Sequence, residues 1–326
     1  MYQLSEFQSD FLQYMKANSF SKAPEGLYEP VDYILQLGGK RLRPVLVLMG
    51  YQLFEANYKA ALPLSMAVEV FHNFSLVHDD IMDAAPLRRG KPTVHQHYGL
   101  NTGILSGDVM LILCYEYLLK VEKKHLVADL VAVFNEMAIK VCEGQQYDMD
   151  FETRQDVTIP SYLMMIEYKT AALIECSLAL GGILAEAGSD NIKHLRAFGR
   201  NIGLAFQMQD DILDTFGDSE KFGKKVGGDI LNNKKTFLVL KAMELATEED
   251  RENLAAWMRT TNEADEEEKI AAVRTLFRKW QVHELAMKKM DQYQKTAFEH
   301  LDQVQVPAAK KQILFDLADQ LLVREV

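Results

Sequence analysis

Apolar residues recur at intervals of three and four along most of this chain, which is the spacing of a helix that buries one face. The segments 68–76, 127–141 and 198–212 keep this pattern over several turns. Asn-Gly pairs and alternating runs of β-branched residues, which would indicate hairpins and strands, are absent from the sequence. The pattern therefore predicts an almost all-α protein with about ten or more helices.

Proline placement favours long helices in the middle of the chain. Between Pro92 and Pro307 only Pro160 interrupts the sequence, and proline is costly inside a helix. The segments 110–119 and 171–187 are apolar on almost every side, so they are expected to be central helices.

The organisation of the chain predicts one domain. The charged stretch 247–269 is typical of a solvated helical hairpin at the periphery. Because no Ser-, Gly- or Pro-rich linker divides the sequence, we expect a single domain over 1–326. Its motif-bearing core would cover about 30–240, with peripheral helices over about 241–326.

Composition narrows the class of protein without identifying it. Of the 326 residues, 48% are hydrophobic and 25% charged, which argues against a disordered chain. The balance of 36 basic and 47 acidic residues gives 36 − 47 = −11, so bulk charge disfavours binding to nucleic acid. Any basic site must therefore be local.

The cysteines and the apolar runs point to a cytoplasmic protein. Cys114, Cys142 and Cys176 form no Cys-x-x-Cys pair, so neither a zinc site nor a disulfide framework is predicted. The first residues do not resemble a secretory signal, and runs such as 44–51 are too short to span a membrane. We expect no transmembrane segment.

The most informative motif, Asp-Asp-x-x-Asp, occurs twice, as Asp79–Asp83 and as Asp210–Asp214. On a helix the first and last aspartates of each motif are i and i+4, so their carboxylates share a face and repel each other. A bound cation would relieve the repulsion, and oxygen ligands with substrate phosphates suit Mg²⁺. The alternative is a pair of solvated acidic helix ends, which the repetition within apolar sequence disfavours. Neither motif has the glycine and distal glutamate of an EF-hand loop.

Polar side chains are expected on the same helix faces as the aspartates. At about 100° per residue, His72 lies about 20° from both Asp79 and Asp83. Gln207 lies about 20° from Asp214 by the same arithmetic. Although a lone histidine is more often a core residue, this alignment favours contact with a substrate.

Basic segments accompany both aspartate motifs. Gly38-Gly39-Lys40-Arg41-Leu42-Arg43-Pro44 stands before a predicted helix and lacks the Walker pattern, yet its cations could grip phosphate. Leu87-Arg88-Arg89-Gly90-Lys91-Pro92-Thr93 follows the first motif, and Phe222-Gly223-Lys224-Lys225 follows the second. An acidic helix end followed by a basic loop suits a metal-bridged polyphosphate.

These motifs together resemble the trans-isoprenyl diphosphate synthases, also called polyprenyl synthetases. The resemblance covers the Gly-Gly-Lys-Arg turn, both aspartate motifs, the two basic loops, the Lys169-Thr170 pair and Phe206–Asp211, in the family's order from about 38 to 236. It implies an all-α bundle around a deep central cavity and a homodimer. It also implies Mg²⁺-dependent condensation of isopentenyl diphosphate with dimethylallyl, geranyl or farnesyl diphosphate.

The resemblance also assigns roles to individual residues. The residues implied to bind isopentenyl diphosphate are Lys40, Arg43, His72 and Arg89. Those implied to bind the allylic diphosphate are Arg88, Lys169, Thr170, Gln207, Lys224 and Lys234. Several Mg²⁺ ions would bridge the diphosphate to Asp79, Asp83 and Asp210, with Asp80, Asp211 and Asp214 as further ligands or holders of water. The residues implied to act in catalysis are Asp79, Asp80, Asp83, Arg88, Lys169, Asp210 and Lys224.

Three other functions stay open from sequence. A terpene cyclase also ionises prenyl diphosphates, but its second metal motif generally contains Asn, Ser or Thr, and Glu. A di-iron bundle needs Glu-x-x-His twice, which Glu69–His72 and Glu122–His125 supply by spacing alone. A non-catalytic partner subunit of a prenyl synthase would typically lose aspartates that this chain retains.

Product length is predicted from the residues that precede the first aspartate motif. In the resembled family, bulky residues here close the floor of the elongation cavity, and Phe74 and Phe71 stand five and eight residues before Asp79. This favours a short product, geranylgeranyl (C20) ahead of farnesyl (C15). On an ideal helix Phe74 lies about 140° from Asp79 and Ser75 about 40°, so ordinary core packing of the phenylalanines stays an alternative.

Overall fold

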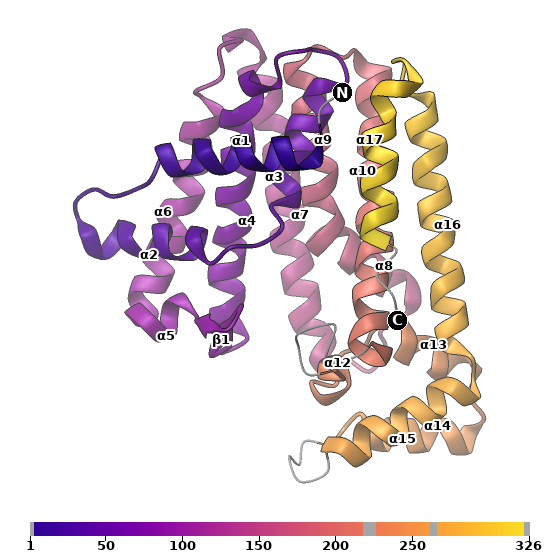
Figure 1. Cartoon of the computed structure of the whole chain (residues 1–326). Coiled ribbons are helices and arrows are strands. Elements are labelled where there is room, and N and C mark those ends of the chain that lie inside the picture. The colour runs from indigo at the N-terminus through magenta and orange to yellow at the C-terminus, as the bar shows by residue number, and fades with distance from the viewer. Residues whose placement is uncertain (1–2, 218–225, 261–265, 323–326) are drawn as a thin grey trace. The chain divides into compact units, whose positions relative to one another are not determined.

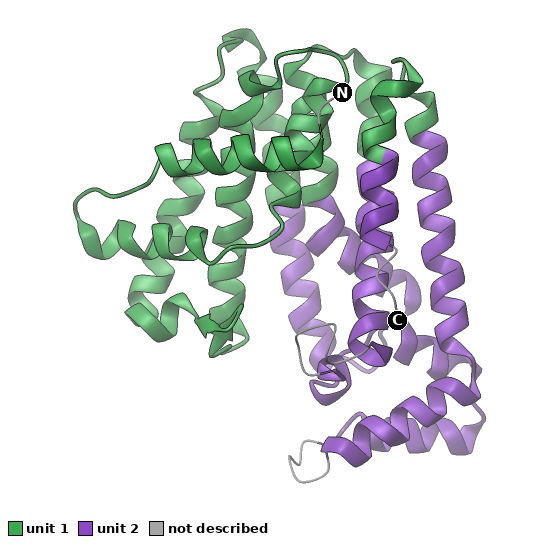
Figure 2. Cartoon of the chain, viewed as in Figure 1, with its two compact units in different colours: residues 1–138, 173–196, 301–314 green, residues 139–172, 197–300, 315–326 purple. Residues whose placement is uncertain are grey.

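The computed structural model describes residues 3–217, 226–260 and 266–322 of the chain (Figure 1). Their fold is almost entirely helical, as the periodicity predicts, and the chain divides into two compact units (Figure 2). Unit 1 comprises residues 1–138, 173–196 and 301–314, and unit 2 comprises 139–172, 197–300 and 315–326. The single domain expected from sequence therefore stays a prediction.

Unit 1 contains the first aspartate motif. Its elements are α1 (Leu4–Ala17), α2 (Glu25–Gln36), α3 (Leu42–Gln52), η1 (Tyr58–Ala61), α4 (Leu62–Met82), β1 (Leu87–Arg88), β2 (Lys91–Pro92), α5 (Val94–Tyr98), α6 (Leu100–Leu118) and η2 (Lys124–Leu126). Helix α4 packs along α6 and against α3. Gly103 and Gly107 of α6 permit this contact, since a Cβ on Gly107 would lie 2.6 Å from Cδ2 of His78.

Unit 2 contains the second aspartate motif. The elements wholly inside it are α8 (Ile159–Ile166), the π-helical turn η3 (Glu167–Ala171), α12 (Gly228–Leu231), α13 (Phe237–Leu245), α14 (Glu248–Trp257) and α15 (Glu266–Lys279). The helices that contribute residues to both units are α7 (Val127–Thr153), α9 (Ala172–Leu184), α10 (Ser189–Phe216), α16 (Val282–Gln303) and α17 (Ala308–Leu322). The charged hairpin expected over 247–269 is α14 with α15, which continues to Lys279.

Sequence reasoning overlooked one small element. The basic loop after the first aspartate motif is a two-stranded hairpin in which Leu87 pairs with Pro92 and Arg88 with Lys91. Its turn residues, Arg89 and Gly90, have φ of 52° and 73°. Two successive left-handed residues give the turn twist that suits a two-residue hairpin. The signal was present as Arg-Gly, although Asn-Gly is the commoner pair.

Helix α4 is also the most membrane-like segment of the described chain. Together with η1 it spans Tyr58–Met82, with a mean hydropathy of 1.3 in its most apolar window, so by length and composition it could cross a bilayer. The same window is 67% buried within the protein. Burial explains the composition, because a core helix is apolar on most sides.

Candidate active site

The first aspartate motif lies at the C-terminal end of α4. Asp79 belongs to the last turn, and Asp83 is the residue at which the helix ends, with its N–H donating to the carbonyl of Asp79 at 2.9 Å. Asp83 is exposed and Asp79 is partly exposed, as expected for a shared face. The helix dipole disfavours carboxylates at this end by roughly 0.3–1 kcal/mol each, so a cation here would be stabilising.

The middle aspartate of this motif has a different environment. Asp80 is 2% exposed, and both of its carboxylate oxygens accept hydrogen bonds from Arg88, at 2.7 Å from Nε and 2.7 Å from Nη2. Arg88 Nη2 also lies 3.6 Å from Asp79. The β1–β2 hairpin thus places the Arg88 guanidinium against the first aspartate motif. Asp80 holds Arg88 in place, which makes Asp80 a weaker candidate for a metal ligand than Asp79 or Asp83.

A cluster of basic residues lies in the same unit. Arg89 donates to the carbonyl of Gly38, and its guanidinium rests so closely on Gly39 that a Cβ there would lie 2.9 Å from Cζ. Gly38 and Gly39 have φ of 85° and 121°, which side chains rarely allow. The Gly-Gly turn and the hairpin turn, far apart in sequence, therefore meet, which brings exposed Lys40 into the same region.

His72 belongs to this cluster. Its Nε2 lies 3.3 Å from Nη1 of Arg43, the second residue of α3. Burial lowers the pKa of His72 well below its usual range, and Arg43 and Arg89 lower it further. A neutral ring can accept a hydrogen bond from Arg43 and keep that guanidinium in place.

Arg41 does not contribute to the exposed basic surface. It is buried, pairs with Glu69 and donates to the carbonyl of Leu35. Asn73 donates to the Glu69 carboxylate as well, at 3.0 Å. The expectation that three adjacent cations grip phosphate is therefore reduced to Lys40 and Arg43. Glu69 is also occupied, which argues against the di-iron arrangement.

The second aspartate motif occupies the last two turns of α10. Asp210 and Asp214 are partly exposed, whereas Asp211 is buried and accepts hydrogen bonds from the Tyr162 hydroxyl and from Gln207 at 2.9 Å. Burial and the charges of Asp229 and Asp210 raise the pKa of Asp211 well above its usual range. A buried carboxyl whose oxygens already accept hydrogen bonds is a poor Mg²⁺ ligand, so Asp210 and Asp214 are the better candidates in this motif.

The lysines assigned to the allylic diphosphate converge on one acid of α7. Lys169 Nζ lies 2.6 Å from Asp148, and Lys234 Nζ lies 3.2 Å from Asp148 and 3.0 Å from Glu152. Although burial raises the pKa of Asp148, the two lysines outweigh it and hold that pKa below its usual value. Burial lowers the pKa of Lys234, but the acids dominate and raise it to about 12.

The remaining contacts join the lysine pair to the second motif. Thr170 donates its hydroxyl hydrogen to Gln207 Oε1 at 2.9 Å, and Gln207 in turn donates to Asp211. Sequence reasoning missed Asp148 and Tyr162, because the acidic stretch 148–152 lacks the Asp-Asp-x-x-Asp pattern and Tyr162 belongs to no motif. Lys224 falls in 218–225, outside the described residues.

No group of three or more His, Cys, Asp or Glu side chains is arranged to hold a metal within residues 3–217, 226–260 and 266–322. Each motif instead offers two carboxylates on one face at a helix C-terminus. Mg²⁺ commonly takes one or two carboxylates and completes its shell with water and phosphate. This donor set fits a metal that arrives with a diphosphate rather than an all-protein cage.

The predicted chain-length residues form an aromatic stack in unit 1. Phe71 is fully buried, with ring centroids 5.5 Å from Phe74 and 5.3 Å from Phe134 of α7. Phe74 in turn lies 4.9 Å from His78. Ser75 donates its hydroxyl hydrogen to the carbonyl of His72. The stack is compatible with both a cavity floor and ordinary core packing.

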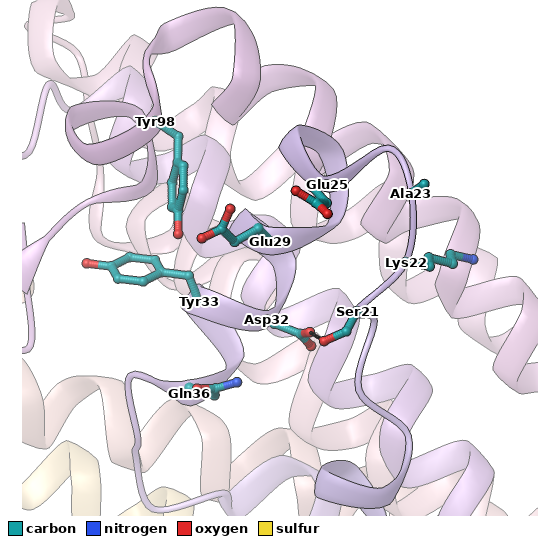
Figure 3. A pocket seen from close by; sticks show the side chains of 9 residues that line it. All are labelled: Ser21, Lys22, Ala23, Glu25, Glu29, Asp32, Tyr33, Gln36 and Tyr98. Atoms are coloured by element: carbon teal, nitrogen blue, oxygen red, sulfur yellow. Dashed lines mark hydrogen bonds between the residues drawn. The ribbon is translucent and has the colours of Figure 1, made fainter.

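A separate hollow of about 710 Å³ lies beside α2 and contains none of the candidate residues (Figure 3). Glu25, Glu29 and Asp32 line it together with Tyr33 and Tyr98. Asp32 accepts hydrogen bonds from the Phe20 N–H and the Ser21 hydroxyl. Lys22 also lines this hollow, but none of the basic residues assigned to a diphosphate does, so we do not assign the hollow to the substrates.

Comparison with known proteins establishes the family. The Polyprenyl synthetase family model matches residues 24–276. The short chain isoprenyl diphosphate synthase of Methanothermobacter thermautotrophicus is 37% identical over 302 residues, 93% of this chain and 91% of that protein. The geranylfarnesyl diphosphate synthase of Natronomonas pharaonis is 38% identical over 240 residues, 68% and 70% of the two chains. A crystal structure of geranylgeranyl pyrophosphate synthase matches with a TM-score of 0.95 and 43% identity over 100% of both chains.

The chain therefore belongs to the polyprenyl synthetase family and has the isoprenoid synthase fold. It is a short-chain prenyltransferase. Family membership implies isopentenyl diphosphate and an allylic diphosphate as substrates. Membership of this family favours a prenyl diphosphate synthase over a terpene cyclase or a non-catalytic subunit. The short-chain prenyltransferase predicted from the motifs is thus confirmed.

Proposed function

We propose that this protein condenses isopentenyl diphosphate head-to-tail with an allylic diphosphate and releases geranylgeranyl diphosphate as its main product. The observation that carries the product length is the Phe71–Phe74–Phe134 stack, which would limit the prenyl chain before Asp79. Relatives of similar identity carry names for products of different length, among them the geranylfarnesyl diphosphate synthase of Natronomonas pharaonis, so overall identity does not determine the product. Farnesyl diphosphate is the alternative product.

The basic residues assigned to the allylic diphosphate would stabilise its charge as it departs. When the allylic carbon–oxygen bond ionises, charge develops on the departing diphosphate, and fixed cations stabilise that charge without reorganising. Arg88, held by Asp80, is preorganised for this role. Lys169 and Lys234 would exchange Asp148 for the diphosphate oxygens, so Asp148 keeps them close together before the substrate arrives. We assign the same substrate to Lys224.

The second substrate would lie at the other basic cluster. Lys40, Arg43, His72 and Arg89 would hold isopentenyl diphosphate so that its double bond attacks the allylic carbocation. The proton lost afterwards would go to the released diphosphate. Enclosure by apolar side chains would keep water from quenching the cation.

Several Mg²⁺ ions would bind through Asp79, Asp83, Asp210 and Asp214. When bound, Mg²⁺ neutralises the diphosphate and assists its departure. The pairs of carboxylates at helix C-termini support this assignment, because a cation offsets both their mutual repulsion and the helix dipole.

We also infer a homodimer. Four large apolar side chains of α6 and one at the residue that follows it are between 42% and 59% exposed: Leu100, Ile104, Leu105, Ile112 and Leu119. A helix face of this kind is typical of an association surface. A sedimentation experiment should give twice the 37.1 kDa mass of the chain.

The three cysteines are free, which agrees with a cytoplasmic location.

Product analysis tests the reaction and the chain length together. Purified protein would be incubated with Mg²⁺, isopentenyl diphosphate and dimethylallyl, geranyl or farnesyl diphosphate. Chromatography of the dephosphorylated products should show C20 as the main alcohol. A main product of C15 or C25 would refute the chain length and leave the reaction intact, whereas no elongation of any primer would refute both.

A further inference from the structure

The turn that carries Lys169 and Thr170 has an unusual backbone. Residues Glu167–Ala171 form the π-helical turn η3 between α8 and α9. Such turns are rare, occur mostly as single turns inside α-helices and are frequent at functional sites. Because an α-helix is the more stable local form, the surroundings must hold the wider turn in place.

Two glycines on neighbouring helices touch this turn. A Cβ on Gly144 of α7 would lie 2.8 Å from Cα of Lys169 and 2.8 Å from the carbonyl carbon of Tyr168. A Cβ on Gly203 of α10 would lie 2.5 Å from Cα and 2.6 Å from Cβ of Ala171. These distances are too short for real contacts, so any larger residue would displace the turn.

The lack of room for a Cβ atom, and not the backbone conformation, explains glycine at these positions. Neither Gly144 nor Gly203 has a positive φ, so both conformations are open to any residue. Inside a helix glycine costs roughly 1 kcal/mol relative to alanine. The protein therefore accepts this cost in two helices, at the points where each meets η3.

The same two helices supply the polar partners of the turn. Asp148, which pairs with Lys169, stands four residues after Gly144 on α7. Gln207, which accepts from Thr170, stands four residues after Gly203 on α10. Residues four apart share a helix face. Each helix thus presents a glycine against the backbone and, one turn later, a partner for the side chain.

We propose that Gly144 and Gly203 are positioning residues that seat the π-helical turn and thereby fix where Lys169 and Thr170 meet the allylic diphosphate. The proposal rests on the proposed function of Lys169 and Thr170. It extends that function to two residues that touch no substrate and act only through the backbone of η3.

The test compares Gly144→Ala and Gly203→Ala with two controls. Gly26→Ala in α2 adds a methyl group to open space, and Gly181→Ala in α9 adds one that would lie 2.7 Å from the Tyr51 backbone nitrogen, away from η3. Lys169→Ala is made in parallel. For each protein the KM for both substrates, the Kd of an unreactive thiolo analogue of the allylic diphosphate and the Tm would be measured.

We expect both glycine variants to raise the allylic KM and the analogue Kd by about tenfold or more, since a misplacement of about 1 Å can cost on the order of 10²-fold. The KM for isopentenyl diphosphate should change little. We expect Gly144→Ala, Gly203→Ala and Gly181→Ala each to lower the Tm. Gly181→Ala should leave both KM values unchanged, and Gly26→Ala should resemble the parent in every measurement. Each glycine variant reports independently, so if one fails to fold the other decides.

Two outcomes would overturn different parts of the reasoning. If Lys169→Ala leaves the allylic KM unchanged, the proposed contact itself is wrong. If Lys169→Ala raises that KM but the folded glycine variants do not, or if Gly181→Ala raises it equally, the positioning role is refuted and the contact stands.

Discussion

Replacing Tyr162 with phenylalanine should destabilise unit 2 through one hydrogen bond. The ring is 2% exposed and its hydroxyl donates to the buried Asp211, so Tyr162→Phe keeps the packing and removes only the donor. A hydrogen bond to a charged group contributes about 1.5–3 kcal/mol and one between neutral groups about 0.5–1.5 kcal/mol. Gln207 still donates to the other oxygen, so the carboxyl keeps one partner.

The pH dependence of this loss follows from the charge of Asp211. Burial raises its folded pKa above the unfolded value, so the protonated folded form predominates between the two, and the free energy of unfolding falls as pH rises through that window. The Tyr162 hydroxyl opposes this shift by favouring the ionised form. Its removal should therefore cost about 0.5–1.5 kcal/mol, the value of a neutral hydrogen bond, while Asp211 is protonated, and progressively more as pH rises through the folded pKa.

Urea denaturation followed by far-ultraviolet circular dichroism at several pH values would measure both effects. We expect the midpoint to fall with an unchanged m-value. Tyr115→Phe is the matched control, because that hydroxyl donates to the neutral Asn135 at 2.6 Å and its loss should not depend on pH. The tryptophans Trp257 and Trp280 both lie in unit 2, so their fluorescence reports on it directly. A loss below about 0.5 kcal/mol, or one that stays constant as pH rises through the folded pKa of Asp211, would refute the reasoning.

Three further predictions concern activity. Asp79→Ala and Asp210→Ala should each lower turnover on the order of 10² or more, as loss of a main charge stabiliser does, and a chelator should abolish activity. Near-parental turnover at saturating substrate would remove that aspartate from the mechanism. Arg43→Ala should raise the KM for isopentenyl diphosphate and Lys224→Ala that for the allylic substrate, and an effect of both on one substrate alone would contradict the assignment. Phe74→Ala, alone or with Phe71→Ala, should lengthen the product by one or more isoprene units, whereas a folded variant with the parental product would make the stack ordinary packing.

Helix pattern and motif residues could be predicted from sequence because both depend on local spacing. The period of three and four located α4, α7 and α10, and the i, i+4 rule placed Asp79 and Asp83 on one face. The inward orientation of Asp80 was also within reach, since a helix turns about 100° per residue. The pattern could not predict that Arg88 contacts Asp80, because Arg88 reaches this face only through the β1–β2 hairpin.

The features that sequence reasoning missed depend on contacts between distant segments. The residues around Lys169 do not predict a π-helical turn, because the glycines that we propose to seat it belong to two other helices. Asp148 is one of several acids on α7, and only the convergence of both Lys169 and Lys234 on it distinguishes it from the others. Glycine four residues before a polar residue is a faint signal in any one helix. It becomes informative only when two helices repeat it against the same turn.

The two aspartate motifs share a division of labour that the helix itself imposes. In each, the outer pair stays accessible at the helix C-terminus, where the dipole and mutual repulsion favour a cation. The middle aspartate, rotated by about 100°, is buried and binds a neighbouring donor: Arg88 in one unit, Tyr162 and Gln207 in the other. Under the proposed metal assignment, one acid of each adjacent pair would receive the ligand while the other fixes the group beside it. An Asp-Asp pair at the end of a helix can thus couple ligand binding to the placement of a second side chain without any additional motif.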